Sequence, residues 1–325
     1  MIKIGNLKVD TKVFTAPMAG VTDYPYRQIL RQQGAELVFT EMVSSMGLLQ
    51  GNSNTHKLIE FERQGGLIGV QIFGDDPAVV AEAAATVEEK YQPDLIDLNF
   101  GCPAPKIVKN GAGSALMRQP DKVYEMVAEA VGSCNLPVTV KIRKGWDDEY
   151  LTGLEVAKAA EEAGAALLTV HGRTREEFYS GKADWSIISD IVNQLEIPVI
   201  GNGDVFAAED AMAMIKKTGV NGVMVARGIQ GYPWLVKEID SFLNKGTRIE
   251  NPSYEERIEM AIKHLKMAVS YYGEVSAVPL MRKHLAWYIK GMPFSARQRE
   301  KINSISDKKL LIDSLYEYLK AIQSN

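Results

Sequence analysis

Eight short apolar runs, rich in β-branched residues, constrain the fold of this 325-residue chain more than any other feature. Each run ends in a polar or glycine-rich segment, and helical periodicity marks most of the segments between them. The later runs recur at intervals of roughly 25 to 30 residues, the length of one βα unit. The runs are residues 13–17, 37–42, 68–73, 95–100, 138–143, 167–172, 198–203 and 222–227.

Eight βα units within about 240 residues predict an α/β fold of the TIM (β/α)8 barrel type. The alternative is a doubly wound sheet, which typically carries a GxGxxG turn after its first strand. The segment that follows the first run here, APMAGVTD at residues 16–23, is not such a turn. We therefore expect the barrel.

The barrel pattern then stops at a connection that contains Gly, Pro and Asn. Ser253 and Glu256 form a capping box that opens a helix, and Gly273 closes that helix. Further helices are expected near 279–290, 295–304 and 307–322. We predict a barrel domain over residues 1–245 and an α-helical bundle domain over residues 246–325.

The composition predicts a soluble, cytoplasmic protein. The chain does not begin with an apolar run of signal-peptide length, and no stretch approaches the ~20 apolar residues of a membrane span. Two cysteines, Cys102 and Cys134, give no disulfide framework and suit a reducing compartment. Without a CxxC or HExxH motif, no metal site is expected. A monomer is the default expectation.

The net charge of −4 is distributed unevenly. Residues 246–325 carry +4 and the preceding residues carry −8. Within 279–301, six basic side chains face a single acidic one, Glu300. Such a segment is either an ordinary solvated face or a surface for a polyanion, and charge alone leaves both interpretations open.

Polar side chains follow the predicted strands at the end where TIM barrels hold their active sites. Packed barrel layers prefer Val, Ile and Leu, so a ring of polar residues indicates a site, although any single one could be structural. The residues at these ends are Pro17, Met18, Ala19, Glu41, Gln71, Asn99, Lys141, Arg143, His171, Arg173, Asn202, Gly203, Asp204, Ala226, Arg227 and Gly228.

The segments GNGD (201–204) and VARG (225–228) follow the last two strands, where barrels commonly bind phosphate beside a short extra helix. Residues 230–243 could be that helix, and Arg227 could add donors. The alternative is two tight turns that merely use glycine. We expect a ligand that carries phosphate.

Lys141 has two interpretations. It is either a Schiff-base lysine, whose pKa burial would have to lower, or a cation that stabilises negative charge on a cofactor or substrate. Barrel phosphate sites serve both aldolases and flavoenzymes, so Lys141 alone does not decide.

Cys102 lies in the segment DLNFGCPAPKIVKNGAGSAL, residues 97–116, where Gly and Pro exclude a helix or a central strand. A lone cysteine is most often a buried structural thiol, an interpretation that suits Cys134 better. On a mobile loop over the barrel mouth, with Lys106 and Lys109 nearby in sequence, Cys102 is expected to act as a nucleophile or an acid.

Together these residues resemble the tRNA-dihydrouridine synthase family, and in particular its bacterial B-type subgroup. The matching motifs keep the family's order over the whole barrel, and RKHLAWYIKGMP at 282–293 extends the resemblance into the helical tail. The motifs are residues 16–23, 69–74, 97–116, 140–147, 168–175, 200–205 and 225–234.

The resemblance implies an FMN-dependent reduction of a uridine in tRNA to 5,6-dihydrouridine, with NADPH as the electron donor. Hydride would pass from flavin N5 to C6 of the uracil, and Cys102 would be the general acid that protonates C5. Asn99 would help to place the uracil. The implied FMN-binding residues are Pro17, Met18, Ala19, Gln71, Lys141, His171, Asn202, Gly203, Asp204, Ala226 and Arg227.

The chemistry is consistent with these roles. Carbon is a poor proton acceptor, so a positioned acid with a pKa near ~8.5 is a suitable donor. Lys141 at the N1–C2 edge would stabilise the anionic reduced cofactor. Because Cys102 must reach a base held above the flavin, we expect it on a flexible lid.

The target base must leave the folded tRNA to meet the flavin, while a local basic surface would bind phosphates. The expected contacts on the helical domain are Arg282, Lys283 and Lys290, and Arg173 is expected to contact substrate at the barrel. The subgroup resemblance suggests a D-loop uridine.

Two other functions stay open at this point. An enzyme like dihydroorotate dehydrogenase shares the barrel, the lysine and the phosphate site, but it gives no reason for a basic helical tail. An RNA-binding protein on an inactive barrel would have no use for Cys102, Lys141 and His171.

Overall fold

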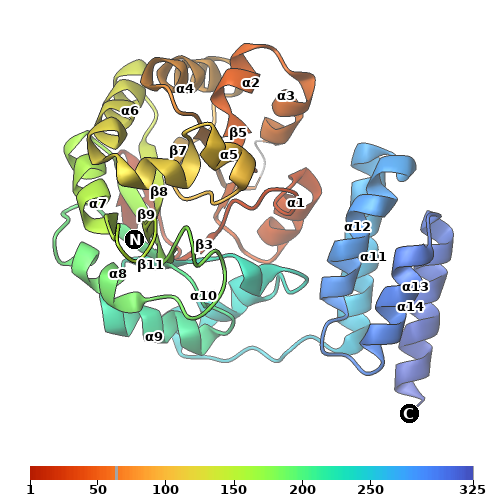
Figure 1. Cartoon of the computed structure of the whole chain (residues 1–325). Helices are drawn as coiled ribbons and strands as arrows, with labels where there is room; N and C mark the ends of the chain where they lie inside the picture. The colour runs from red at the N-terminus through yellow and green to blue at the C-terminus, as the bar shows by residue number, and fades with distance from the viewer. Residues whose placement is uncertain (63–64, 325) are drawn as a thin grey trace.

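Figure 1 shows the computed structural model of the chain, which describes residues 1–62 and 65–324. Parallel strands form a ring at its centre, helices surround the ring, and four further helices stand beside it. This arrangement confirms the predicted TIM barrel followed by a set of helices. Asn325, the end of the predicted helical domain, lies outside the described residues.

All eight predicted runs form strands of the barrel. Their bounds are β3 Val13–Thr15, β4 Leu37–Phe39, β6 Leu67–Phe73, β7 Leu95–Asn99, β8 Val138–Gly145, β9 Leu167–Thr174, β10 Val199–Asn202 and β11 Gly222–Val225. They pair in parallel in the order β4-β6-β7-β8-β9-β10-β11-β3, and the short β5 (Val43–Ser44) pairs with β6. β3 and β4, the ends of this order, contact each other and complete the ring.

Helices follow the strands and cover the outside of the ring (Figure 1). Several begin where an aspartate ends the preceding loop, because the side chains of Asp23, Asp76 and Asp184 accept hydrogen bonds from the first-turn N–H groups of α1, α4 and α8. The bounds are α1 Tyr24–Gln32, α2 Ser45–Leu49, α3 Ser53–Ile59, α4 Pro77–Tyr91, α5 Pro105–Lys109, η1 Gly113–Arg118, α6 Pro120–Ser133, α7 Gly153–Glu162, α8 Trp185–Val192, α9 Ala208–Thr218, η2 Arg227–Ile229 and α10 Leu235–Lys245.

An antiparallel hairpin, β1 (Ile2–Ile4) with β2 (Leu7–Val9), precedes the barrel and was not expected from the sequence. Its apolar side chains join a buried cluster with Phe14, Leu37 and other residues near the starts of the strands. The hairpin therefore packs against the amino-terminal end of the barrel, opposite the mouth.

The prediction that residues 230–243 form the short extra helix beside the phosphate site was wrong. The short helix after β11 is η2, while α10 begins at Leu235 and packs against β3 and α9 as a barrel helix. Gly231 separates the two helices with a positive φ of 69°. A Cβ there would lie 2.5 Å from the Tyr288 nitrogen, so the close approach requires glycine.

The four C-terminal helices are α11 (Tyr254–Tyr272), α12 (Glu274–Tyr288), α13 (Ser295–Ser304) and α14 (Lys308–Gln323). Ser253 and Glu256 form the predicted capping box. α12 begins five residues earlier than the predicted segment 279–290. The prediction began the helix at Pro279, but this proline lies inside the helix. Val275, whose carbonyl has no N–H partner at Pro279, is 91% exposed and can be hydrated by water. Within the described residues, each helix is too short or too polar to cross a membrane.

A buried aromatic cluster joins these helices to the barrel. Tyr26 of α1 stacks on His264 of α11 with ring centroids 5.0 Å apart, and it also packs against His284 of α12 at 5.8 Å. The Tyr288 hydroxyl lies 3.3 Å from His264 Nδ1. Burial lowers the pKa of His264 well below its usual value and that of His284 to about 3, so both rings are neutral.

We expect His264→Phe to reduce the acid sensitivity of the fold. The native state cannot protonate buried His264, whereas the unfolded chain does so below about pH 6.5, so this stabilisation is present above that pH and is lost as the pH falls. Between pH 7.5 and 5.5 the wild type should lose about 1.4 kcal/mol more unfolding free energy than the variant in urea titrations. Equal losses in both proteins would contradict this account.

Candidate functional site

The carboxyl ends of the strands open into a cavity of about 430 Å³, within the size range of small-molecule sites. The structure gathers most of the predicted site residues around it, from the ends of six strands (β3, β7, β8, β9, β10 and β11) and the loops that follow them. These are Pro17, Met18, Ala19, Asn99, Cys102, Lys141, His171, Asn202, Gly203, Asp204, Ala226 and Arg227. The sequence analysis did not single out Met42, Phe178, Tyr179, Phe206 and Gln230, which also line the cavity, although Gln230 lies inside the motif at 225–234.

The backbone of Cys102 makes two hydrogen bonds within its loop, and the flexibility of that loop stays a prediction. The N–H of Cys102 donates to Asn99 Oδ1 at 2.9 Å, and its carbonyl accepts from Ser114 N at 3.0 Å. Gly113 packs beneath it with a positive φ of 59°, and a Cβ there would lie 2.8 Å from the Cys102 carbonyl oxygen. The glycines of this loop therefore allow close packing around the thiol.

The charges that act on the Cys102 thiol come from Arg143 and Lys141, while Lys106 and Lys109 lie exposed on α5. Burial raises the pKa of the thiol, and the Ala104 N–H and the two cations oppose that effect only in part. The thiol therefore keeps its proton at neutral pH, as a proton donor must.

Lys141 is half-buried in the cavity wall, and its ammonium donates to Asn202 Oδ1 at 3.2 Å. Burial, with help from the charge of Arg143, lowers the pKa of Lys141 to about 8, while Asp97 and Cys102 act in the opposite direction. At pH 7 the side chain still carries its charge in most molecules.

Asp204 organises the opposite end of the cavity. Its carboxylate accepts two hydrogen bonds from Arg173 at 2.8 Å, one from Arg227 at 3.0 Å and one from Ala183 N at 2.7 Å. Burial raises its pKa, but the Ala183 N–H and the two arginines outweigh this and hold the pKa below its usual value. Arg173 is 1% exposed and braces Asp204 instead of lining the cavity, which corrects its predicted contact with substrate.

His171 lies next to this ion cluster and is neutral. Burial and the charges of Lys141 and Arg143 lower its pKa well below the usual value. A Cβ on Gly203 would lie 3.1 Å from the His171 ring and 2.6 Å from Ala183, so glycine allows both residues to pack closely here.

Gln71, predicted to contact the cofactor, is fully buried behind the cavity wall. Its side-chain amide lies between Asp97 and Asn99, and it donates to the first and accepts from the second. Gln71 thus contacts the cavity-lining Asn99, and its contact with the cofactor stays a prediction.

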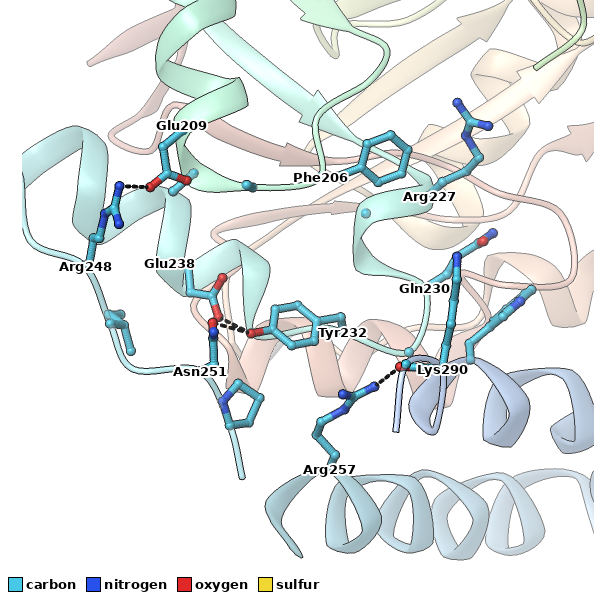
Figure 2. Close-up of a pocket in the computed structure, with 18 of the residues that line it drawn as sticks. Phe206, Glu209, Arg227, Gln230, Tyr232, Glu238, Arg248, Asn251, Arg257 and Lys290 are labelled. Carbon is cyan, nitrogen blue, oxygen red and sulfur yellow. Dashed lines mark hydrogen bonds and ion pairs between the residues drawn. The ribbon is translucent and has the colours of Figure 1, made fainter. Parts of the chain in front are cut away.

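A second, larger hollow of about 970 Å³ lies between the barrel and the C-terminal helices. It shares Phe206, Arg227 and Gln230 with the first cavity, so the two adjoin at these residues. Figure 2 shows the Lys290 side chain extending toward Gln230, with Arg248 and Arg257 on other walls. We call this hollow the interdomain groove.

The three basic residues predicted on α12 and its end separate in the structure. Lys290 lines the interdomain groove, and the Lys283 ammonium lies near Gly20 beside the barrel mouth. Arg282 instead donates to the Ile305 carbonyl at 3.0 Å within the helical bundle. Because the Arg282 guanidinium is bonded within the bundle, it does not share a common surface with Lys283 and Lys290.

A family model described as dihydrouridine synthase matches residues 14–323 of the chain. A probable tRNA-dihydrouridine synthase of Rickettsia bellii is 40% identical over 99% of both chains. The tRNA-dihydrouridine synthase B of Pseudomonas aeruginosa is 38% identical and covers 100% of this chain and 98% of its own.

Solved structures share the barrel at low sequence identity. The structure of DHODH from Eimeria tenella in complex with ferulenol aligns with a TM-score of 0.55 at 15% identity, over 74% of this chain and 82% of the other. Histamine dehydrogenase from Rhizobium sp. 4-9 aligns with a TM-score of 0.56 at 15% identity, over 82% and 50%. These likenesses concern the fold.

We expect Asp204→Asn to destabilise the protein by about 2 kcal/mol at pH 7, because buried Arg173 loses its anionic partner. Asparagine also tolerates the positive φ of 57° at this position, so the variant isolates the charge. The matched control is Glu209→Gln, which removes the exposed pair with Arg248 and should cost less than about 0.5 kcal/mol. Equal losses of unfolding free energy in urea would show that Asp204 does not hold the cluster.

Proposed function

The chain belongs to the dihydrouridine synthase family, whose members are oxidoreductases that act on tRNA uridines, and we propose that it does so with FMN as cofactor and NADPH as electron donor. The observation that carries the proposal is the convergence of Cys102, Asn99 and Lys141 on one cavity, in a chain whose family match covers residues 14–323. Its reaction would convert uridine to 5,6-dihydrouridine.

The residues of the cavity fit FMN. Pro17, Met18 and Ala19 offer an apolar wall for a flat ring, and Lys141 supplies a half-buried cation for its polar edge. At the other end, Gly203, Ala226 and Arg227 would hold the phosphate, with His171 and Asn202 along the ribityl chain. Asp204 would serve by orienting Arg227, since its carboxylate would repel a phosphate.

Bound FMN would supply the hydride that C6 of the uracil ring receives. Cys102 would donate the proton to C5, a role that suits a thiol kept protonated by burial. Asn99 holds the backbone of Cys102 through Oδ1 and would also help to orient the uracil. Lys141, charged below a pKa of about 8, would stabilise negative charge beside the ring.

We assign residues 1–245 to catalysis and residues 246–325 to tRNA binding. The interdomain groove supports this division, because Arg248, Arg257 and Lys290 line a hollow that adjoins the catalytic cavity (Figure 2). Phosphates lying in this groove would bring a flipped uridine to the cavity. A uridine of the D-loop is the proposed target.

The test of the proposed function is reduction of tRNA that lacks dihydrouridine by purified protein and NADPH, with the two-hydrogen mass gain located to a nucleotide. We expect activity from the wild type and at least ~100-fold less from Cys102→Ala, because proton transfer contributes about that much. Cys134→Ala, a matched thiol control, should behave like the wild type. No mass gain in tRNA by FMN-loaded wild type would refute the proposal.

We expect Lys283→Gln/Lys290→Gln to weaken tRNA binding and to flatten its salt dependence. Each lost phosphate contact reduces the slope of log affinity against log salt by about 0.7 to 0.9, so the slope should fall by roughly 1.5. Lys309→Gln/Lys320→Gln removes two exposed charges from α14 and should leave the slope unchanged. The same slope in all three proteins would exclude Lys283 and Lys290 from the interface.

A further inference from the structure

A buried carboxylate begins a chain of hydrogen bonds behind the cavity. Asp97 on β7 is 1% exposed and does not line the cavity. Its Oδ1 accepts from the Thr139 hydroxyl and its Oδ2 accepts from Gln71 Nε2, both at 2.6 Å. Both of its oxygens are thus acceptors toward neighbouring strands.

The chain continues from Gln71 to the reactive loop. Gln71 Oε1 accepts from Asn99 Nδ2 at 2.8 Å. Asn99 Oδ1 in turn accepts from the N–H groups of Gly101 at 3.1 Å and of Cys102 at 2.9 Å. A continuous path of side-chain contacts therefore connects Asp97 with the backbone of Cys102.

The path has a fixed direction. A backbone N–H only donates hydrogen bonds, and at the other end of the path Asp97 Oδ2 accepts from the Gln71 amide. The side-chain amides of Gln71 and Asn99 between these ends must therefore both turn their NH2 groups toward Asp97 and their oxygens toward Cys102. If the amide of Asn99 rotated by half a turn, its NH2 group would face two N–H donors and the loop would lose both bonds.

We propose that Asp97 and Gln71 are positioning residues for Cys102, acting through the orientation of the Asn99 amide. This inference rests on the proposed function, in which Cys102 must point at a base held in the cavity. In this role the fully buried Gln71 needs no contact with a ligand. The proposal also accounts for the Asp97 carboxylate, which reaches neither the cavity nor an arginine. Buried polar chains of this kind specify one arrangement when every member is satisfied.

The first measurement is the alkylation of both thiols by iodoacetamide in the purified full-length protein at one pH, followed by peptide mass spectrometry. Cys134, which is remote from the chain of bonds, is the internal reference. Gln71→Met keeps the side-chain volume and removes both of its hydrogen bonds. We expect the Cys102 to Cys134 rate ratio to rise roughly tenfold, because the loop is released by the loss of a buried hydrogen bond.

Two variants separate orientation from a general disturbance of the core. Because two facing buried carboxylates cannot both ionise, the Gln71→Glu side chain shares one proton with Asp97 and still accepts from Asn99, so this variant should stay within about threefold of the wild type. Thr139→Val removes the bond on the far side of Asp97 and should change the ratio less than about twofold. The proposal is overturned if Gln71→Met leaves the ratio unchanged, or if either of the other variants shifts it as much as Gln71→Met.

The second measurement is the rate of tRNA reduction by variants of Gln71 and Asp97. Gln71→Met should lower kcat roughly tenfold with little change in KM, because the acid is misplaced while the groove is intact. Asp97→Leu should do the same if it folds. An unchanged kcat would overturn the positioning role. If alkylation responds as expected but the wild type does not reduce tRNA, the positioning stands and the proposed function fails.

Discussion

The register of the parallel strands is the constraint on which the site depends. Asn99 lies opposite Lys141, and His171 lies opposite both Arg143 and Asn202 on the two neighbouring strands. Because side chains alternate between the two faces of a strand, a slip of one residue would turn these groups into the layer beneath the helices. Buried apolar residues between them, such as Val140 and Ile142, would then enter the mouth, which makes the slip costly.

The elements of this barrel could be predicted because each one is specified locally. Apolar runs that end in polar or glycine-rich segments predicted the eight strands, and the capping box at Ser253 predicted the start of α11. The rule that a proline marks a helix boundary misplaced the start of α12. Pro279 lies inside that helix, where Val275 in the preceding turn is exposed to solvent. Position along the chain also identified most of the cavity, because strand ends in a parallel barrel meet at one face.

Contacts between distant segments could not be predicted in the same way. Proximity in sequence associated Cys102 with Lys106 and Lys109, whereas its electrostatic partners are Arg143 and Lys141 on the next strand. The sequence predicted that Arg173 contacts substrate, whereas in the structure Arg173 is buried and pairs with Asp204. In both cases a polar residue at a strand end supports another residue of the site, and only the spatial arrangement distinguishes the two roles.

The balance of charge around the cavity explains why an anion suits one end of it. Lys141, Arg143, Arg173 and Arg227 act together on His171, and all of them lower its pKa. Asp204 is the carboxylate that faces Arg173 and Arg227, and Arg173 alone can satisfy it through two hydrogen bonds. Arg227, whose side chain is 37% exposed, therefore has donors left for the proposed phosphate while Asp204 orients it. Arg227 thus remains an available cation at the point where the cavity adjoins the interdomain groove.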